Sequence, residues 1–179
     1  MAGSEEWPAR LCLFKAARVS IRGILMEPET AAVVAELNGL WTEVKQMVRD
    51  VPPQALVYKP GDGFNSISVL VTHMTGSQKW WIGEILAGRK MHRDRDAEFS
   101  VEEADPAVLV RRLDEAANLV SEVLEPVTAE MLDKTRLYRD RLVTVRWILM
   151  RVLAHTAQHM GQMQIIQKLW ALHHGTSPS

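Results

Sequence analysis

The stretch that decides the fold is residues 144–172, TVRWILMRVLAHTAQHMGQMQIIQKLWAL. Its apolar residues recur at three- and four-residue intervals, the period of one buried face of a helix. Thr144 is a good N-cap, and Gly175 lies just past the end, where glycine favours a left-handed C-cap. We therefore predict a helix from about Thr144 to Leu172. Its predicted inward face mixes apolar and polar side chains: Val152, His155, His159, Gln162 and Ile166.

Three earlier segments carry the same helical period. The first, 28–49, ends before Pro52 and Pro53, which cannot continue a helix. The second, 65–87, starts at a capping asparagine or serine and stops at a glycine, and the third, 106–126, starts at a proline. Their predicted inward faces are Val33, Leu37, Leu40, Trp41, Val44, Met47 and Val48 in the first, Val69, Leu70, His73, Ser77, Trp80 and Glu84 in the second, and Leu109, Leu113, Ala116, Val120 and Val123 in the third. Four long amphipathic helices predict an all-α four-helix bundle.

The segments between these helices are predicted to be loops. Residues 88–105, GRKMHRDRDAEFSVEEAD, are densely charged and have no apolar period, so we expect a solvated loop there. Residues 133–141 contain turn formers, and nowhere does an alternating pattern predict a strand. The long second connection allows a crossover, so the sequence does not determine the order of the helices in space.

Composition narrows the class of protein. A chain of 179 residues with 47% hydrophobic content is long enough for one domain with a sizeable core. The formal net charge is -1, which gives no overall attraction to nucleic acid or to an anionic membrane. No uncharged apolar run approaches the roughly 20 residues that a membrane-spanning helix needs. The lone cysteine, Cys12, excludes an internal disulfide, so we expect a reducing compartment, the cytoplasm.

The first 25 residues differ from the rest in composition. They contain four basic and two acidic residues, a net charge of 4 − 2 = +2. Lys15 and Arg18 interrupt the only apolar stretch, which argues against a secretory signal. We expect residues 1–25 to be an extension outside the core, with Met26 as the natural start, and residues 26–174 to form the bundle domain. A transit-like peptide is the alternative interpretation of the extension.

Three of the six histidines fall on predicted inward faces. His155 and His159 are four residues apart, so both lie on one side of the last helix and can reach one ion. That pair alone fits two ordinary core histidines equally well. His73, in the middle of the second helix's apolar face, shifts the balance toward a metal. Three imidazoles with open coordination positions are typical of a catalytic metal site, so we predict a divalent ion on His73, His155 and His159.

Nitrogen ligands suit zinc, nickel, iron(II) or copper, and the residues do not choose between these metals. The sequence motifs of several other enzyme classes are absent. There is no HExxH of the metzincin type, no ExxH pair for a di-iron bundle, and no GxxxxGK[ST], GxSxG or GxGxxG.

The ordered set of these features resembles the DinB-like family. The resemblance covers about residues 28–172. It rests on the amphipathic first helix, a PG-containing linker into NSISVLVTHM, the following KWW, and a final HxxxHxGQ formed by His155, His159, Gly161 and Gln162. It implies a metal-binding four-helix bundle that is often dimeric, with His73, His155 and His159 as the metal ligands. Some relatives are thiol-dependent S-transferases or isomerases that use bacillithiol, mycothiol or glutathione. The sequence ends soon after the predicted last helix, so we expect no counterpart of the extra C-terminal segment that some members carry.

Our functional hypothesis is a metalloenzyme that acts on a small molecule. The ion would lower the pKa of a thiol or a water, for S-transfer or for hydrolysis, and a low-molecular-weight thiol is a candidate cofactor. We assign no catalytic residue beyond the ligands, and the base comes from substrate, solvent or a side chain such as Glu84. The alternative is a non-catalytic metal-binding or dimerisation bundle with a stress-related role.

Several other side chains have weaker functional interpretations. Gln162 is either an amide that orients a ligand or a plain amide at the edge of the core. Tyr138 is either a phenol at the mouth of the site or a surface residue, and at least one of Trp80 and Trp81 belongs to the core. Cys12 is not a credible nucleophile. A basic cluster could bind an acidic thiol or simply be solvated: Arg136, Arg139, Arg141 and Arg146.

Overall fold

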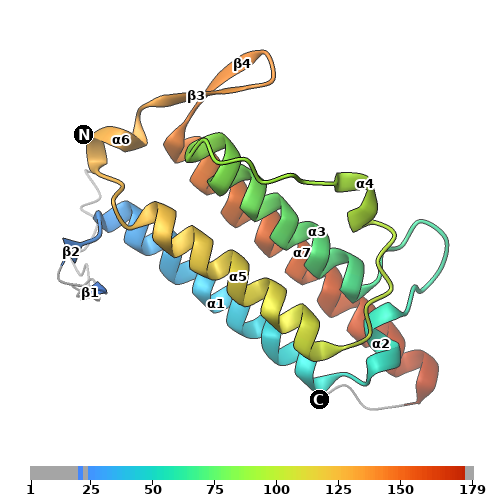
Figure 1. The fold of residues 1–179 in the computed structure, drawn as a ribbon. Coiled ribbons are helices and arrows are strands. Elements are labelled where there is room, and N and C mark those ends of the chain that lie inside the picture. The colour runs from blue at the N-terminus through green and yellow to red at the C-terminus, as the bar shows by residue number, and fades with distance from the viewer. Residues whose placement is uncertain (1–19, 22–23, 176–179) are drawn as a thin grey trace, which may run out of the picture.

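The computed structural model describes residues 20–21 and 24–175, and in this part of the chain four long helices form a bundle (Figure 1). They are α1 (Pro28–Asp50), α3 (Ile67–Gln78) with its continuation η1 (Lys79–Leu86), α5 (Pro106–Leu124) and α7 (Val145–His174). The predicted all-α four-helix bundle is confirmed. A two-residue strand pair, β1 (Ser20–Ile21) and β2 (Ile24–Leu25), precedes α1. Cys12 lies outside the described residues, and the domain boundary at Met26 stays a prediction.

The helix ends lie where the capping residues placed them. The Ser66 hydroxyl accepts a hydrogen bond from the backbone N–H of Val69 at the start of α3, and Thr144 caps α7 in the same way. Gly175 ends α7 with φ of 64°, in the left-handed region that glycine adopts without strain. α7 therefore includes His173 and His174, which the sequence analysis placed beyond the helix.

Each long helix packs against two others. α1 contacts α5 and α7, and α3 contacts the same two, so α1 and α3 lie diagonally across the bundle. Figure 1 shows that α1 and α7 run in one direction while α3 and α5 run in the other. Because α3 and its neighbour α5 are parallel, the chain between them has to return along the whole length of the bundle. The crossover that the long second connection allowed is residues 87–105.

The core consists of the predicted apolar faces. On α1 and α5 the expected residues are buried, except Leu40, which is half-buried. A polar chain crosses this core: the Trp41 indole N–H donates to Gln78 Oε1 at 3.3 Å, and the Gln78 amide donates to Thr156 Oγ1 at 2.8 Å. Buried amides and hydroxyls with partners of this kind bring specificity to a core without leaving polar groups unsatisfied.

The inward face predicted for the second helix is buried only as far as Ser77, and Trp80 and Glu84 are half-buried. From Lys79 to Leu86 the helix widens to π geometry, and the Ala87 N–H bonds to the Ile82 carbonyl five residues back at 3.1 Å. The wider turn rotates the following side chains, so Trp81 is buried and Trp80 is half-buried. Sequence periodicity assumed 3.6 residues per turn and could not anticipate this change of register.

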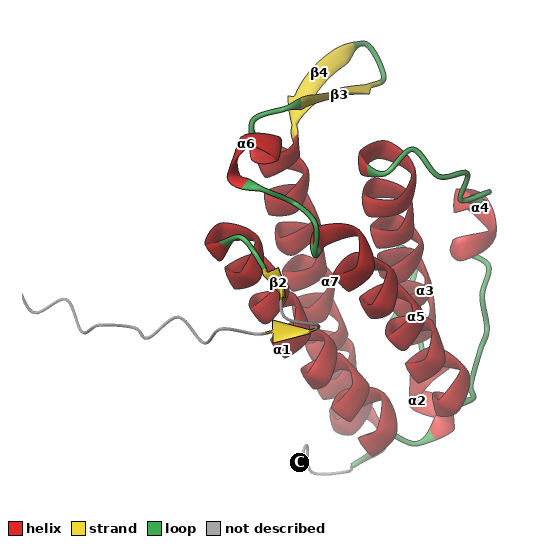
Figure 2. Ribbon diagram, turned by 60° about the vertical axis from the view of Figure 1, so that its left-hand side comes forward, coloured by secondary structure: helices red, strands yellow, loops and turns green. Residues whose placement is uncertain are grey.

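The connections contain more structure than the sequence analysis predicted. Short helices α2 (Pro53–Val57) and α6 (Ala129–Leu132) lie in two of them. The expectation of no strands was wrong, because β3 (Thr135–Tyr138) and β4 (Arg141–Thr144) form an antiparallel hairpin that projects beyond the bundle (Figure 2). Its strands are too short for a clear alternation, and its turn, Arg139–Asp140, has neither the asparagine nor the glycine typical of two-residue hairpin loops.

The solvated loop predicted for residues 88–105 is only partly confirmed. They contain α4 (Arg95–Glu98), which packs against α3 on the outside of the bundle (Figure 2). Glu98 is only 6% exposed. In the described part of the chain, no helix has the length and apolar character needed to cross a membrane.

Candidate metal centre

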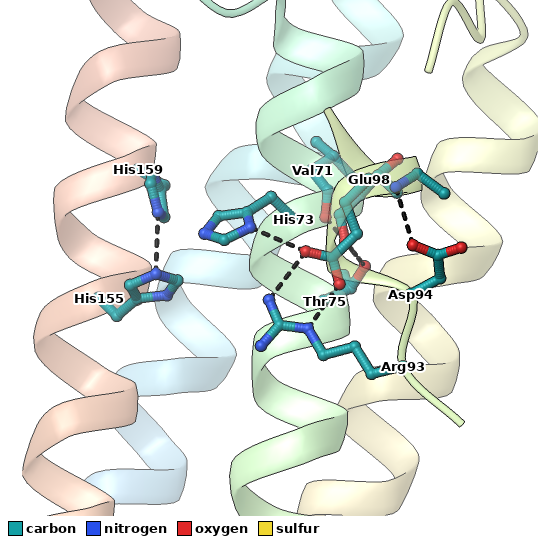
Figure 3. A network of polar contacts seen from close by, with 10 residues as sticks. Val71, His73, Thr75, Arg93, Asp94, Glu98, His155 and His159 are labelled. Atoms are coloured by element: carbon teal, nitrogen blue, oxygen red, sulfur yellow. Dashed lines mark hydrogen bonds and ion pairs between the residues drawn. The ribbon is translucent and has the colours of Figure 1, made fainter. Parts of the chain in front are cut away.

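Three histidine side chains meet between α3 and α7. His73 comes from α3, and His155 and His159 come from successive turns of α7 (Figure 3). One ring nitrogen of each lies within 4.8 Å of the corresponding nitrogens of the other two. The Nε2 atoms of His155 and His159 are 3.0 Å apart. The structure thus brings together all three residues that the sequence singled out, at a spacing from which one ion could be reached.

The outer nitrogens of two rings are held by other side chains. His73 Nδ1 lies 2.9 Å from Glu98 Oε2, and His159 Nδ1 lies 2.7 Å from Gln162 Oε1 (Figure 3 shows the first contact). An oxygen partner at Nδ1 favours the tautomer in which Nδ1 carries the proton, which leaves the Nε2 lone pair free to bind a metal. Gln162 is exposed and not inward as predicted, yet its amide orients His159, one of the two roles considered for it.

Glu98 is the residue that sequence reasoning missed. Its carboxylate also accepts hydrogen bonds from Arg93, at 2.6 Å from Nε to Oε1 and 2.8 Å from Nη2 to Oε2. Burial by itself raises the pKa of Glu98, but the hydrogen bonds from Arg93 and His73 outweigh it and bring the pKa below its usual value. Glu98 is therefore a charged carboxylate that fixes the ring of His73.

Gly76 makes room for this carboxylate. It lies one helical turn after His73, and a Cβ atom at this position would collide with Oε1 of Glu98. Phe99, next to Glu98, packs its ring 4.7 Å from that of His73, measured between centroids. An apolar residue within the charged segment 88–105 and a glycine on the face of His73 were the only sequence signals of this contact.

The histidine pair on α7 is held in its neutral form. Burial, followed by the nearby His159 and His73 and by Arg151 and Arg93, lowers the pKa of His155 to about 3. Burial lowers the pKa of His159 as well, against the opposing effect of its hydrogen bond to Gln162. Neutral imidazole has the free lone pair that a metal requires, so this donor set fits a divalent ion.

A cavity of about 480 Å³ opens above the cluster, and both His73 and His155 line it. Trp80, Trp81 and Tyr138 also line it, so Tyr138 shares this cavity with His73 and His155. Trp81 and Tyr138 pack with their ring centroids 4.6 Å apart. The hairpin thus contributes one wall of the cavity.

The four arginines of the predicted basic cluster contact different parts of the protein and do not form one anion-binding surface. Of its four members only Arg139 lines the cavity. Arg136 donates to the carbonyl of Leu86, and Arg146 pairs with Glu29 and Asp133. The guanidinium of Arg141 lies over the rings of Tyr138 and Trp147.

Glu84, the proposed base, lies elsewhere. Its carboxylate accepts a bond from the backbone N–H of Met91 at 3.3 Å, and its side chain does not line the cavity. That position supports a role in holding the start of the crossover and not one in proton transfer at the histidines.

The fold is that of the DinB-like helical bundles, which confirms the DinB-like resemblance drawn from the sequence. The chain belongs to the family described as "Protein of unknown function (DUF1572)", which matches residues 30–174. No curated protein sequence matches the chain.

Three solved structures show the same fold. YfiT from Bacillus subtilis, described as a probable metal-dependent hydrolase with an unusual four-helix bundle topology, has a TM-score of 0.67 and 17% identity over 88% of this chain and 94% of its own. The DinB-like protein YjoA from Bacillus subtilis has a TM-score of 0.61 and 20% identity over 82% of this chain and 93% of its own. The colibactin self-resistance protein ClbS, solved with double-stranded DNA, has a TM-score of 0.57 and 14% identity over 78% of this chain and 95% of its own.

Proposed function

We propose that this protein binds one divalent metal ion through His73, His155 and His159 and uses it in a reaction on a small molecule. The observation that carries the proposal is the convergence of three ring nitrogens within 4.8 Å, with two of the histidines, His73 and His155, lining a cavity. Glu98 and Gln162 support it, because each holds the outer nitrogen of a ligand histidine, as partners of metal ligands do.

The ion would supply a lowered pKa for a water or a thiol in the cavity. Three neutral histidines leave the charge of the ion uncompensated, which favours this kind of activation. Zinc, nickel and iron(II) suit the nitrogen ligands. Hydrolysis and thiol transfer both remain within the proposal, and the description of YfiT as a metal-dependent hydrolase supports the first. The histidines and Glu98 act by positioning, and no second acid or base touches the three-histidine cluster among the described residues.

The cavity favours an enzyme over a non-catalytic metal bundle. A purely structural site encloses its ion with four protein ligands, whereas this cluster offers three and faces open space. The likeness to ClbS is one of fold. The net charge of -1 gives this chain no overall attraction to DNA. Anisotropy titration with a labelled DNA duplex at physiological salt is the check, and tight binding there would contradict a small-molecule role.

The test begins with elemental analysis of protein purified without a polyhistidine tag and loaded separately with zinc, nickel or iron(II). One ion per chain is expected for the wild type and none for His155→Ala or His159→Ala, with the helical circular-dichroism spectrum unchanged. His173→Ala is the matched control, since His173 is exposed in the last turn of α7. Retention of one metal ion per chain by either variant would contradict the proposal of a three-histidine site. Loaded protein is then screened with ester and phosphoester substrates, and with low-molecular-weight thiols plus an electrophile.

A further inference from the structure

The cavity above the histidines has a one-sided charge. Four arginines line it: Arg93, Arg95, Arg139 and Arg151. Neither an aspartate nor a glutamate does so in the part of the chain that the structure describes. An excess of guanidinium groups around a small concave site is typical of anion recognition, because guanidinium bonds carboxylates and phosphates in a planar, two-pronged geometry.

Most of this positive charge has no counter-ion within the protein. Arg93 is compensated by Glu98, but Arg95, Arg139 and Arg151 form no ion pair with any described residue. Arg151 is the most informative of the three, since it is half-buried and precedes His155 on α7 by four residues, hence by one turn on the same face. Its charge also contributes to lowering the pKa of His155. A half-buried guanidinium without a carboxylate partner is free to form a charge-assisted hydrogen bond with an anionic ligand.

Arg139 has a second unusual property. It occupies the first position of the hairpin turn with φ of 55°, a left-handed conformation that costs free energy for a residue with a long side chain. Glycine would fit this turn better. Strain of this kind persists at functional positions, and here it keeps an arginine at the rim of the cavity.

Aromatic rings form the neighbouring wall. The ring centroids of Trp80 and Tyr138 are 5.8 Å apart, and Trp81 lies next to both. Both tryptophans and the tyrosine line the same cavity as Arg139 and Arg151, and the Arg139 guanidinium lies over the Tyr138 ring, 5.3 Å from its centroid. A ligand that fills this space would have an anionic group on the arginine side and a flat apolar body against the rings.

We propose that the substrate carries a carboxylate or phosphate group, which Arg139 and Arg151 bind while an apolar, planar body packs against Trp80 and Tyr138. This inference rests on the proposed function, because it places the reacting part of that molecule next to His73 and His155. It narrows the substrate class from any small molecule to anionic ones.

The test uses four probes: benzoate, its neutral isostere benzamide, phenyl phosphate, and acetate, which has the charge without the ring. Binding is followed by isothermal titration calorimetry and by quenching of tryptophan fluorescence, on metal-free and on metal-loaded full-length protein. We expect benzoate or phenyl phosphate to bind at least about tenfold more tightly than benzamide and acetate, also without metal. The better of the two anions identifies the group. Equal binding of benzoate and benzamide would overturn the inference.

Two variants distinguish binding of the anion by the arginines from direct binding of the anion to the metal. Arg151→Gln should weaken binding of the better anion about tenfold, and Arg139→Gly should weaken it while keeping or raising the melting temperature, since glycine relieves the strained turn. Arg49→Gln, an exposed residue of α1, is the control for net charge. Anion binding that needs metal but is insensitive to both variants overturns the inference.

Metal content is measured on the same samples, so the two proposals can fail separately. Arginine-dependent anion binding in a protein that takes up no metal would contradict the proposed function alone. Stoichiometric metal with no preference for anions would contradict only the substrate class.

Discussion

The Nδ1 atom of His73 lies 2.9 Å from the Oε2 atom of Glu98, although 25 residues separate them in the chain. The contact exists because α3 and α5 are parallel neighbours and the connecting segment returns along the outside of α3. Arg93, on the same segment, donates hydrogen bonds to both oxygens of the carboxylate. The crossover therefore supplies the residues that orient one of the three candidate ligands.

Removing the Glu98 carboxylate should weaken metal binding. Glu98→Ala leaves His73 free to rotate, so we expect about a 10–100-fold loss of metal affinity, and a smaller loss for Glu98→Gln, which keeps an oxygen acceptor. Competition with a chromophoric zinc chelator measures the affinity. Glu102→Gln, exposed on the same segment, is the control for charge. Unchanged affinity in both Glu98 variants would show that the contact does not orient the ligand.

A methyl group at Gly76 should weaken metal binding, as removal of the Glu98 carboxylate should. Gly76→Ala pushes against Oε1 of Glu98, so metal affinity should fall and the free energy of unfolding should drop by about 1–3 kcal/mol. Gly39→Ala is the matched control, because Gly39 is also helical but faces open space, and alanine there should add about 0.5–1 kcal/mol. Urea denaturation compares the two variants. A Gly76→Ala protein as stable as the Gly39→Ala protein would contradict the close packing.

Chelation should lower the melting temperature without unfolding the protein. A ligand that binds only the folded state stabilises it by about 2.7 kcal/mol at roughly 100 times its Kd, which corresponds to roughly 5–10 °C for a chain of this size. The metal-free bundle should keep its helical circular-dichroism spectrum at neutral pH, because its apolar core does not depend on the ion. If chelator leaves the melting temperature of metal-containing protein unchanged, the ion is not bound by these histidines.

Acidification should destabilise the metal-free protein. The pKa of His155 is about 3 in the folded chain, against ~6.5 for a free histidine, so between these values the unfolded chain binds the extra proton. The contribution of neutral His155 to the free energy of unfolding is therefore fully present above pH ~6.5 and is lost progressively as the pH falls toward 3. The lowered pKa of His159 acts in the same direction.

Urea midpoints of metal-free protein between about pH 7 and pH 5 measure this effect. His155→Gln should flatten the pH dependence, whereas His173→Ala should preserve it. A wild-type midpoint that rises on acidification would have the wrong sign. With metal present the loss should be steeper, since protons and the ion compete for the same nitrogens.

The helices and the histidine triad were predictable because the information for them is local. Apolar period, capping residues and prolines act within a few residues, so they placed the starts of α3, α5 and α7 and the left-handed end of α7. The four-residue spacing of His155 and His159 alone put them on one face. The π geometry after Gln78 escaped this reasoning, since it depends on how the end of α3 packs, and so did α4 and the β3–β4 hairpin.

Tertiary structure decided what surrounds the triad. Glu98 sits in a segment whose charges predict exposure, and its burial depends on the crossover and on the space left by Gly76. Arg151 on α7 and Arg139 in the hairpin turn line the same cavity, and no spacing in the chain relates them. Local interactions determine where a helix begins and which side is apolar, but contacts between distant segments follow from the packing order of the helices, which the amphipathic pattern leaves open.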